Sequence, residues 1–159
     1  MKITIVTVGK IKEKYLTAGI QEYLKRLTPH CRLDIVELNE ERMPDNPSPA
    51  EKAQAISREG ERIQKSIRPG THLIVLDVAG QMLSSEQLAA KFDTLALAGQ
   101  SDLTFVIGGA FGLSPDVLAA AKERLSFSRM TFTHQMIRLL LVEQIYRAFK
   151  ISRGEPYHW

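Results

Sequence analysis

The chain has 159 residues, of which 44% are hydrophobic and 25% are charged, so we expect one globular domain spanning residues 1–159. The net charge of +3 permits a nucleic-acid partner without requiring one. A single cysteine, Cys31, excludes a disulfide framework and a cysteine-based zinc cluster, and we expect no metal. Neither a signal-peptide pattern nor a long apolar run is present, so we expect a cytoplasmic protein outside the membrane.

The first half of the chain is predicted to alternate between strands and helices. Lys2–Val8 alternates in the manner of a strand and is followed by a helix over 13–27, then by a strand over Arg32–Leu38. The helix is predicted to bury Tyr15, Leu16, Ile20, Tyr23, Leu24 and Leu27. Residues 39–50 are polar and rich in proline, which favours a mobile loop. Ser48 and Pro49 then begin a helix that runs to about Ile67.

The second half continues the alternation. A near-continuously apolar run over 72–78 predicts a central strand, and Ser84 caps a helix that ends before Gly99. The remaining predicted elements are a strand over 103–107, a helix over 114–122, a weak strand over 124–127 and a last helix over 135–152. This order predicts an α/β domain of three layers with a mostly parallel sheet.

A glycine-rich turn follows the strand over 103–107. Gly108, Gly109 and Gly112 remove side chains there, and Ser114 with Pro115 begins the next helix. Ligands of open α/β sheets bind at such turns, at the carboxyl ends of strands. The glycines could instead serve only a tight turn, but three within five residues favour binding. Neither a dinucleotide-binding fingerprint nor a phosphate loop follows the first strand.

The last predicted helix is apolar around most of its circumference. Only Glu143, Arg147 and Lys150 form a polar stripe, with Glu143 and Arg147 spaced as an i,i+4 ion pair. A helix this apolar needs cover on two sides. We expect the sheet on one side and a second copy of the chain on the other, which predicts a homodimer.

Polar and aromatic residues at the two ends of this helix are candidates for function. Arg138 lies on its apolar side, which is explained equally well by a buried ion pair and by a substrate-facing charge at a dimer interface. His134 at the entrance is more typical of a capping or packed residue than of a functional one. The chain ends in Tyr157-His158-Trp159, which could stack on a base, and His158 could accept a proton.

Several stretches resemble the SPOUT class of methyltransferases, and specifically the family of ribosomal RNA large subunit methyltransferase H. They are Met1-Lys-Ile-Thr-Ile-Val-Thr-Val-Gly-Lys, Phe105-Val-Ile-Gly-Gly-Ala-Phe-Gly-Leu, Leu125-Ser-Phe-Ser-Arg-Met-Thr-Phe-Thr-His-Gln-Met-Ile-Arg, Glu143-Gln-Ile-Tyr-Arg-Ala-Phe-Lys-Ile and Pro156-Tyr-His. The resemblance implies a homodimer with a trefoil-knotted region over about 103–159 that binds S-adenosylmethionine. It also implies methylation of N3 of pseudouridine 1915 in helix 69 of 23S rRNA, on assembled 70S ribosomes.

The resemblance also implies a set of site residues. The expected cofactor-binding residues are Leu76, Gly108, Gly109, Gly112, Phe127, Ser128, Arg129, Met130, Thr131 and Phe132. The expected catalytic residues are Arg138, Tyr157 and His158. The alternatives are a non-catalytic RNA-binding α/β module, a SPOUT methyltransferase with another RNA target and a nucleotide-dependent enzyme of another class.

Overall fold

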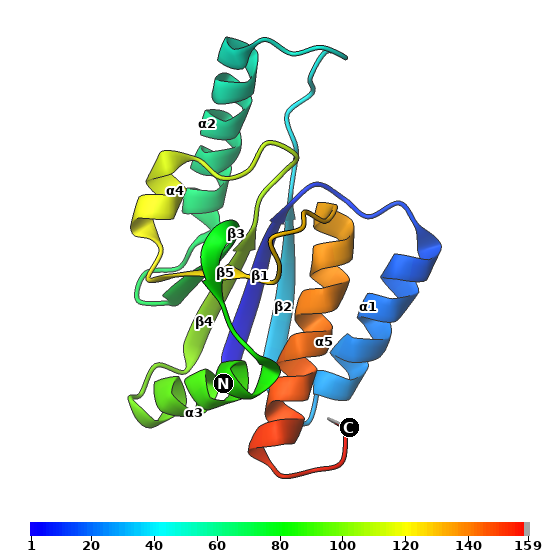
Figure 1. Cartoon of the computed structure of the whole chain (residues 1–159), viewed down its shortest axis with the longest axis vertical. Coiled ribbons are helices and arrows are strands. Elements are labelled where there is room, and N and C mark those ends of the chain that lie inside the picture. The colour runs from blue at the N-terminus through cyan, green and yellow to red at the C-terminus, as the bar shows by residue number, and fades with distance from the viewer. Residues whose placement is uncertain (158–159) are drawn as a thin grey trace.

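The computed structural model describes residues 1–157, in which strands and helices alternate from end to end (Figure 1). The elements are β1 (Lys2–Val8), α1 (Lys14–Leu27), β2 (Arg32–Leu38), α2 (Pro49–Ser66), β3 (His72–Met82), α3 (Ser85–Leu97), β4 (Asp102–Ile107), α4 (Pro115–Ala120), β5 (Glu123–Ser126) and α5 (His134–Ser152). The predicted helix starts at Ser48, Ser84 and Ser114 are confirmed, because each serine side chain accepts a hydrogen bond from the first turn that it caps.

The strands form one parallel sheet in the order β2-β1-β4-β3-β5. This confirms the predicted α/β class and its parallel sheet. β3 is interior as expected, although β4 is the middle strand. β3 is also longer than predicted, because after a shift in register between Leu76 and Gln81 it pairs with β5 a second time.

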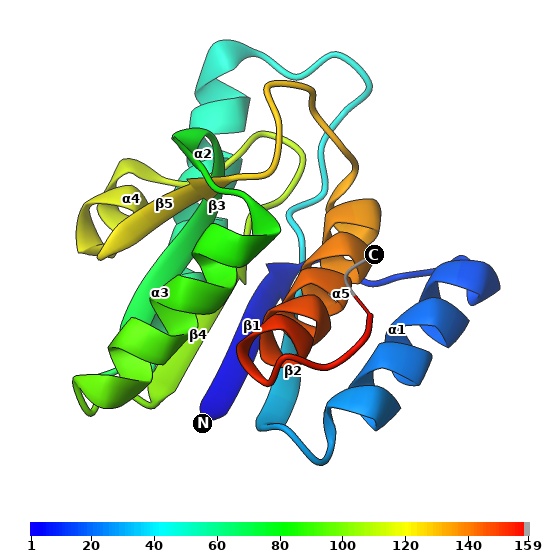
Figure 2. The same cartoon turned by 60° about the horizontal axis from the view of Figure 1, so that its bottom comes forward.

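Helices cover both faces of the sheet, which gives the three predicted layers (Figures 1 and 2). On one face α1, α3 and α5 pack on alternate residues of β1 and β4, such as Ile5 and Phe105. On the other face α2 and α4 pack on the intervening residues, such as Val6 and Val106. α5 lies between α1 and α3, so this chain itself covers much of its apolar surface.

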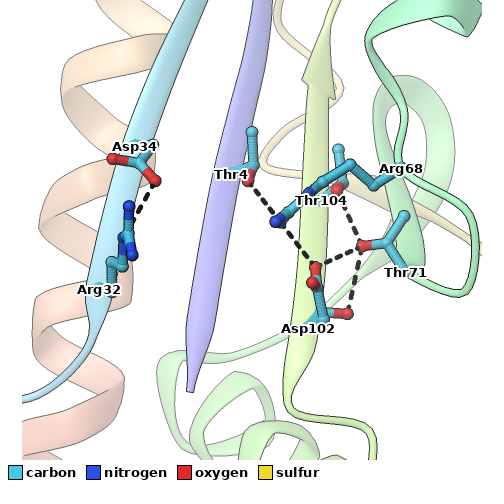
Figure 3. Close-up of polar contacts among 7 residues, drawn as sticks. All are labelled: Thr4, Arg32, Asp34, Arg68, Thr71, Asp102 and Thr104. Atoms are coloured by element: carbon cyan, nitrogen blue, oxygen red, sulfur yellow. Dashed lines mark hydrogen bonds and ion pairs between the residues drawn. The ribbon is translucent and has the colours of Figure 1, made fainter.

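A polar cluster lies at the amino-terminal ends of the parallel strands (Figure 3). Arg68 donates hydrogen bonds to Thr4 Oγ1 at 3.1 Å and to Asp102 Oδ1 at 3.0 Å, and so ties β1 to β4. The hydroxyl of Thr71 lies 3.0 Å from Asp102 Oδ1 and 2.8 Å from Thr104 Oγ1. These contacts hold together the ends of the strands that lie opposite to the glycine-rich turn.

One predicted core residue is not in the core. Tyr15 is 68% exposed, whereas Leu16, Ile20 and Leu27 are buried. The reason is helical geometry, since Tyr15 is rotated about 100° from Leu16 and therefore lies beside the buried stripe.

Candidate functional site

A cavity of about 930 Å³ opens at the carboxyl ends of β3 and β4. Its walls come from residues 76–78 in the middle of β3, where the pairing with β5 shifts, from the β4–α4 turn and from the segment that joins β5 to α5. The helices after these two strands, α3 and α4, leave to opposite faces of the sheet (Figure 2). Ligand crevices of open α/β sheets form at such points.

Nine of the ten residues predicted to bind the cofactor line this cavity. They are Leu76, Gly108, Gly109, Gly112, Phe127, Ser128, Met130, Thr131 and Phe132. The tenth, Arg129, is exposed and is not part of the lining. Three segments of the sequence therefore border one cavity, while the role of these residues in cofactor binding stays a prediction.

The glycine-rich turn brings backbone, rather than side chains, to the cavity. The amide of Gly112 donates to the carbonyl of Gly109 at 3.2 Å, and Gly112 has a φ of +91°, a conformation that side-chain-bearing residues rarely adopt. A Cβ on Gly108 would come within 2.9 Å of Leu113 Cδ2, and one on Gly109 within 2.8 Å of Glu59 Oε1. Glycine is therefore favoured at Gly108 and Gly109 by their close neighbours and at Gly112 by its backbone conformation.

The third wall, between β5 and α5, is shaped by short side-chain hydrogen bonds. Ser126 Oγ donates to the carbonyl of Ser128 at 3.0 Å, and Ser128 Oγ accepts from the amide of Met130 at 3.0 Å. Met130 and Phe132 are 74% and 46% exposed, so the mouth of the cavity presents apolar surface to solvent.

His134 and Asp77 line the cavity, although neither was among the predicted site residues. His134 Nδ1 is buried and has no hydrogen-bond partner within residues 1–157. Burial and the nearby Arg138 lower the pKa of His134, which favours the neutral imidazole. Asp77 Oδ1 accepts a hydrogen bond from the amide of Ala79 at 3.1 Å. The sequence signal for Asp77 is its place at the end of a buried strand.

Arg138 is held inside the chain. Its side chain is 3% exposed and donates to Glu37 Oε2 at 2.7 Å, Thr7 Oγ1 at 3.0 Å and the Gly9 carbonyl at 3.0 Å. Of the two alternatives for this residue, the structure shows the buried ion pair. Arg138 does not line the cavity, and it fastens the start of α5 to β1 and β2.

Tyr157 packs against its own chain, away from the cavity. Its hydroxyl lies 3.1 Å from that of Tyr23 and donates to Glu143 Oε1 at 3.1 Å. Glu143 also forms the predicted ion pair with Arg147, at 2.7 Å. Glu143 follows the start of α5 by nine residues, which is about 13 Å along the helix. The predicted residue His158 lies outside the described part of the chain.

Charge and metal-ligand content add little to this picture. Lys10, Lys12 and Lys14 are exposed just past the end of β1. Within residues 1–157, no cluster of three or more His, Cys, Asp or Glu side chains is arranged to hold a metal ion. No helix in that part of the chain is long and apolar enough to cross a membrane. Burial raises the pKa of the Cys31 thiol to about 11, which leaves it a poor nucleophile.

Comparisons with known proteins match nearly the whole chain. Residues 1–158 match a family described as predicted SPOUT methyltransferase. Over 157 residues the chain is 55% identical to the ribosomal RNA large subunit methyltransferase H of Pelotomaculum thermopropionicum, covering 99% of this chain and 98% of that protein. Over 158 residues it is 57% identical to the protein of the same name from Carboxydothermus hydrogenoformans, covering 99% of each.

A solved structure shares the fold at much lower identity. It is a probable methylase family protein from Haemophilus influenzae Rd KW20, with a TM-score of 0.53 and 16% identity. The match covers 96% of this chain and 68% of that chain.

Proposed function

Because this chain belongs to the SPOUT methyltransferase family, we propose that it transfers a methyl group from S-adenosylmethionine to N3 of pseudouridine 1915 in helix 69 of 23S rRNA. The observation that carries the proposal is the cavity, where nine residues predicted to bind the cofactor lie together. The names of the relatives support ribosomal RNA of the large subunit as the substrate. The site of action we propose is the cytoplasm, on assembled 70S ribosomes.

The cavity suits S-adenosylmethionine in size and in chemistry. Its volume of about 930 Å³ falls within the range of small-molecule sites. The turn at Gly108 and Gly112 brings backbone rather than side chains to the cavity wall, and backbone N–H and C=O groups can recognise the edge of an adenine ring. Leu76, Phe127 and Ile107 add apolar surface for the ring faces. Asp77 contributes a carboxylate that can accept hydrogen bonds from ribose hydroxyls.

The protein has two chemical tasks in this reaction. When bound, the cofactor supplies a methyl group on a positively charged sulfur. The cavity walls must hold the target base in line with that methyl group, and positioning of this kind supplies a large part of the rate. A side chain must also accept the proton that N3 of the target nucleotide loses, and we assign the role of this proton acceptor to His158.

We propose that each active site is shared between two chains of a homodimer. In its own chain, Tyr157 packs about two turns or more along α5 from the cavity. The last residues of one chain would therefore act at the cavity of the partner. The trefoil knot expected for the family would enclose the three cavity segments.

Calorimetry with S-adenosylmethionine tests the assignment of the cavity. The wild-type protein should bind the cofactor, and a folded Gly108→Trp variant should not, because the new side chain collides with Leu113 and fills the turn. If this variant binds with wild-type affinity, the cofactor site is elsewhere. A wild-type protein that binds RNA but no cofactor would favour the non-catalytic RNA-binding module.

Methylation assays test the substrate. The net charge of the chain is only +3, so recognition should depend on the shape of the assembled ribosome. We expect methylation of purified 70S ribosomes and little methylation of protein-free 23S rRNA. Efficient modification of the free RNA would contradict this part of the proposal, and modification at another nucleotide would identify a different RNA target.

A further inference from the structure

Tyr157 is held from several sides by residues of its own chain. Its ring meets the ring of Tyr146 edge-on, with centroids 4.8 Å apart, and the guanidinium of Arg147 lies 4.8 Å from its centroid. Its hydroxyl contacts Tyr23 of α1 and Glu143 of α5. The ring of this side chain is therefore in contact with α5, and its hydroxyl is in contact with both α1 and α5.

The hydrogen bonds fix Tyr157 as a donor. It donates to Glu143 Oε1, which also accepts from Arg147, while Glu143 Oε2 accepts from Gln144 at 2.9 Å. The hydroxyl of Tyr23 is then left to donate to that of Tyr157. Burial and these neighbours raise the pKa of Tyr157, so the phenol keeps its proton at neutral pH. A phenol held in this way is poorly suited to accept a proton from a substrate.

The backbone before Tyr157 is built to fold back along α5. Gly154 has a φ of +64°, and its amide donates to the carbonyl of Ile151 at 3.0 Å. The amide of Glu155 donates to the carbonyl of Lys150 at 3.0 Å, and the two side chains form an ion pair. The turn at Gly154 and the contacts of Tyr157 together hold residues 155–157 against the surface of α1 and α5.

We propose that Tyr157 is a positioning residue that anchors the C-terminal tail to its own subunit. The anchor fixes the place of Tyr157 on the surface of α1 and α5. Tyr157 was expected to be catalytic, and the anchor is proposed in place of that role. Only the activity measurements below rest on the proposed function. It predicts that removing the hydroxyl of Tyr23 acts on the tail as removing that of Tyr157 does, because the two share one hydrogen bond.

The test compares Tyr157→Phe, Tyr23→Phe and the double variant with Tyr15→Phe. Tyr15 is the matched control, because it lies on the same helix as Tyr23 but is exposed. Each variant keeps its aromatic ring, so the fold should persist. The first measurement is hydrogen exchange of the backbone amides of residues 153–155 and 157, because Pro156 has no N–H. The second is kcat and its pH profile on 70S ribosomes.

If Tyr157 is an anchor, exchange should be roughly threefold to tenfold faster in Tyr23→Phe, which loses one hydrogen bond, and faster by at least this factor in Tyr157→Phe, which loses two. The double variant should be no worse than Tyr157→Phe alone. kcat should fall by a similar factor, the pH profile should keep its shape, and Tyr15→Phe should match wild type. Unchanged exchange in both variants would overturn the anchor.

A chemical role gives a different pattern. In that case Tyr157→Phe alone should lose activity on the order of 100-fold, with Tyr23→Phe active and exchange unchanged. If the wild-type protein fails to methylate ribosomes, the proposed function fails, but the exchange experiment still decides whether Tyr157 anchors the tail.

Discussion

At the scale of single residues, the glycines of the β4–α4 turn are required for two different reasons. Gly112 is needed for its positive φ. Crowding is not the reason, because a Cβ at this position would meet open space. Gly108 is needed because a Cβ would collide with Leu113, although its φ is ordinary. The sequence showed that three glycines cluster, but the reason for each depends on neighbours that only the folded turn brings close.

Gly112→Ala should weaken cofactor binding about tenfold, because an alanine at this φ strains the turn and displaces the backbone groups that face the cavity. The matched control is Gly99→Ala, which has a φ of +77° and equally open surroundings, at the opposite edge of the sheet. Both variants should lose about 1 kcal/mol of unfolding free energy in denaturant titrations. Calorimetry should show weaker binding of S-adenosylmethionine for Gly112→Ala only, and equal affinities would contradict the role of the turn.

The Arg138 network should contribute strongly to stability. Arg138→Met leaves the buried hydroxyl of Thr7 and the Gly9 carbonyl without their donor, so we expect a loss of about 3 kcal/mol. The exposed pair of Arg32 and Asp34, 3.6 Å apart in Figure 3, provides the control, and Arg32→Met should cost about 0.5 kcal/mol or less. Urea unfolding measures both, and similar losses would show that Arg138 is not structurally special.

At the scale of elements, local signals were enough to place most helix starts. The caps at Ser48, Ser84 and Ser114 depend on residues three positions away, which a sequence displays directly. By contrast, Arg138 pairs with Glu37, which is 101 residues away in the sequence. The second pairing of β3 with β5 depends on a shift in register. Such long-range features lie beyond periodicity and capping, so the ion pair was one of two open alternatives and the length of β3 was underestimated.

The short strand β5 is fastened by Glu123, and this contact should respond to acid. Burial would raise the pKa of Glu123, but hydrogen bonds from Lys91 and His72 outweigh it and lower the pKa below its usual 4.5. A carboxyl whose pKa is lower in the folded state stabilises the protein above the unfolded pKa, and this stabilisation is lost as the pH falls through the folded value.

Glu123→Gln should therefore destabilise the protein by a constant amount above about pH 5, and the difference from wild type should shrink below pH 4.5. Urea unfolding across this pH range checks the prediction. A difference that stays constant down to pH 2 would mean that the carboxylate charge of Glu123 contributes nothing.

At the scale of the whole molecule, the three-layer α/β architecture follows from the alternation of strands and helices. The strand order β2-β1-β4-β3-β5 does not follow, since alternation fixes which elements exist and not which strands are neighbours. The cofactor segments were placed by family resemblance, and all three border one cavity. The homodimer and the knot remain predictions.

A mixed dimer tests whether the active site is shared. One chain carries Gly108→Trp, which blocks its cavity, and the other lacks residues 157–159. Each homodimer should be inactive, whereas the mixed dimer should regain one working site from the intact cavity and the intact tail. A folded, verified mixed dimer without activity would show that the tail acts in its own subunit.

The position of α5 between α1 and α3 has a consequence for how the protein is made. The helix that completes the core, through Leu141 and Ile145, is the last of the described elements and shares a core cluster with Ile20 and Leu27 of the first helix. During synthesis, the apolar surface of α1 must wait for a helix that begins more than 100 residues after it, whereas α3 lies much nearer to α5 in the sequence. Contacts between segments as far apart as α1 and α5 form slowly. The nascent chain therefore lacks both a closed core and a complete cavity until its last segment has been made.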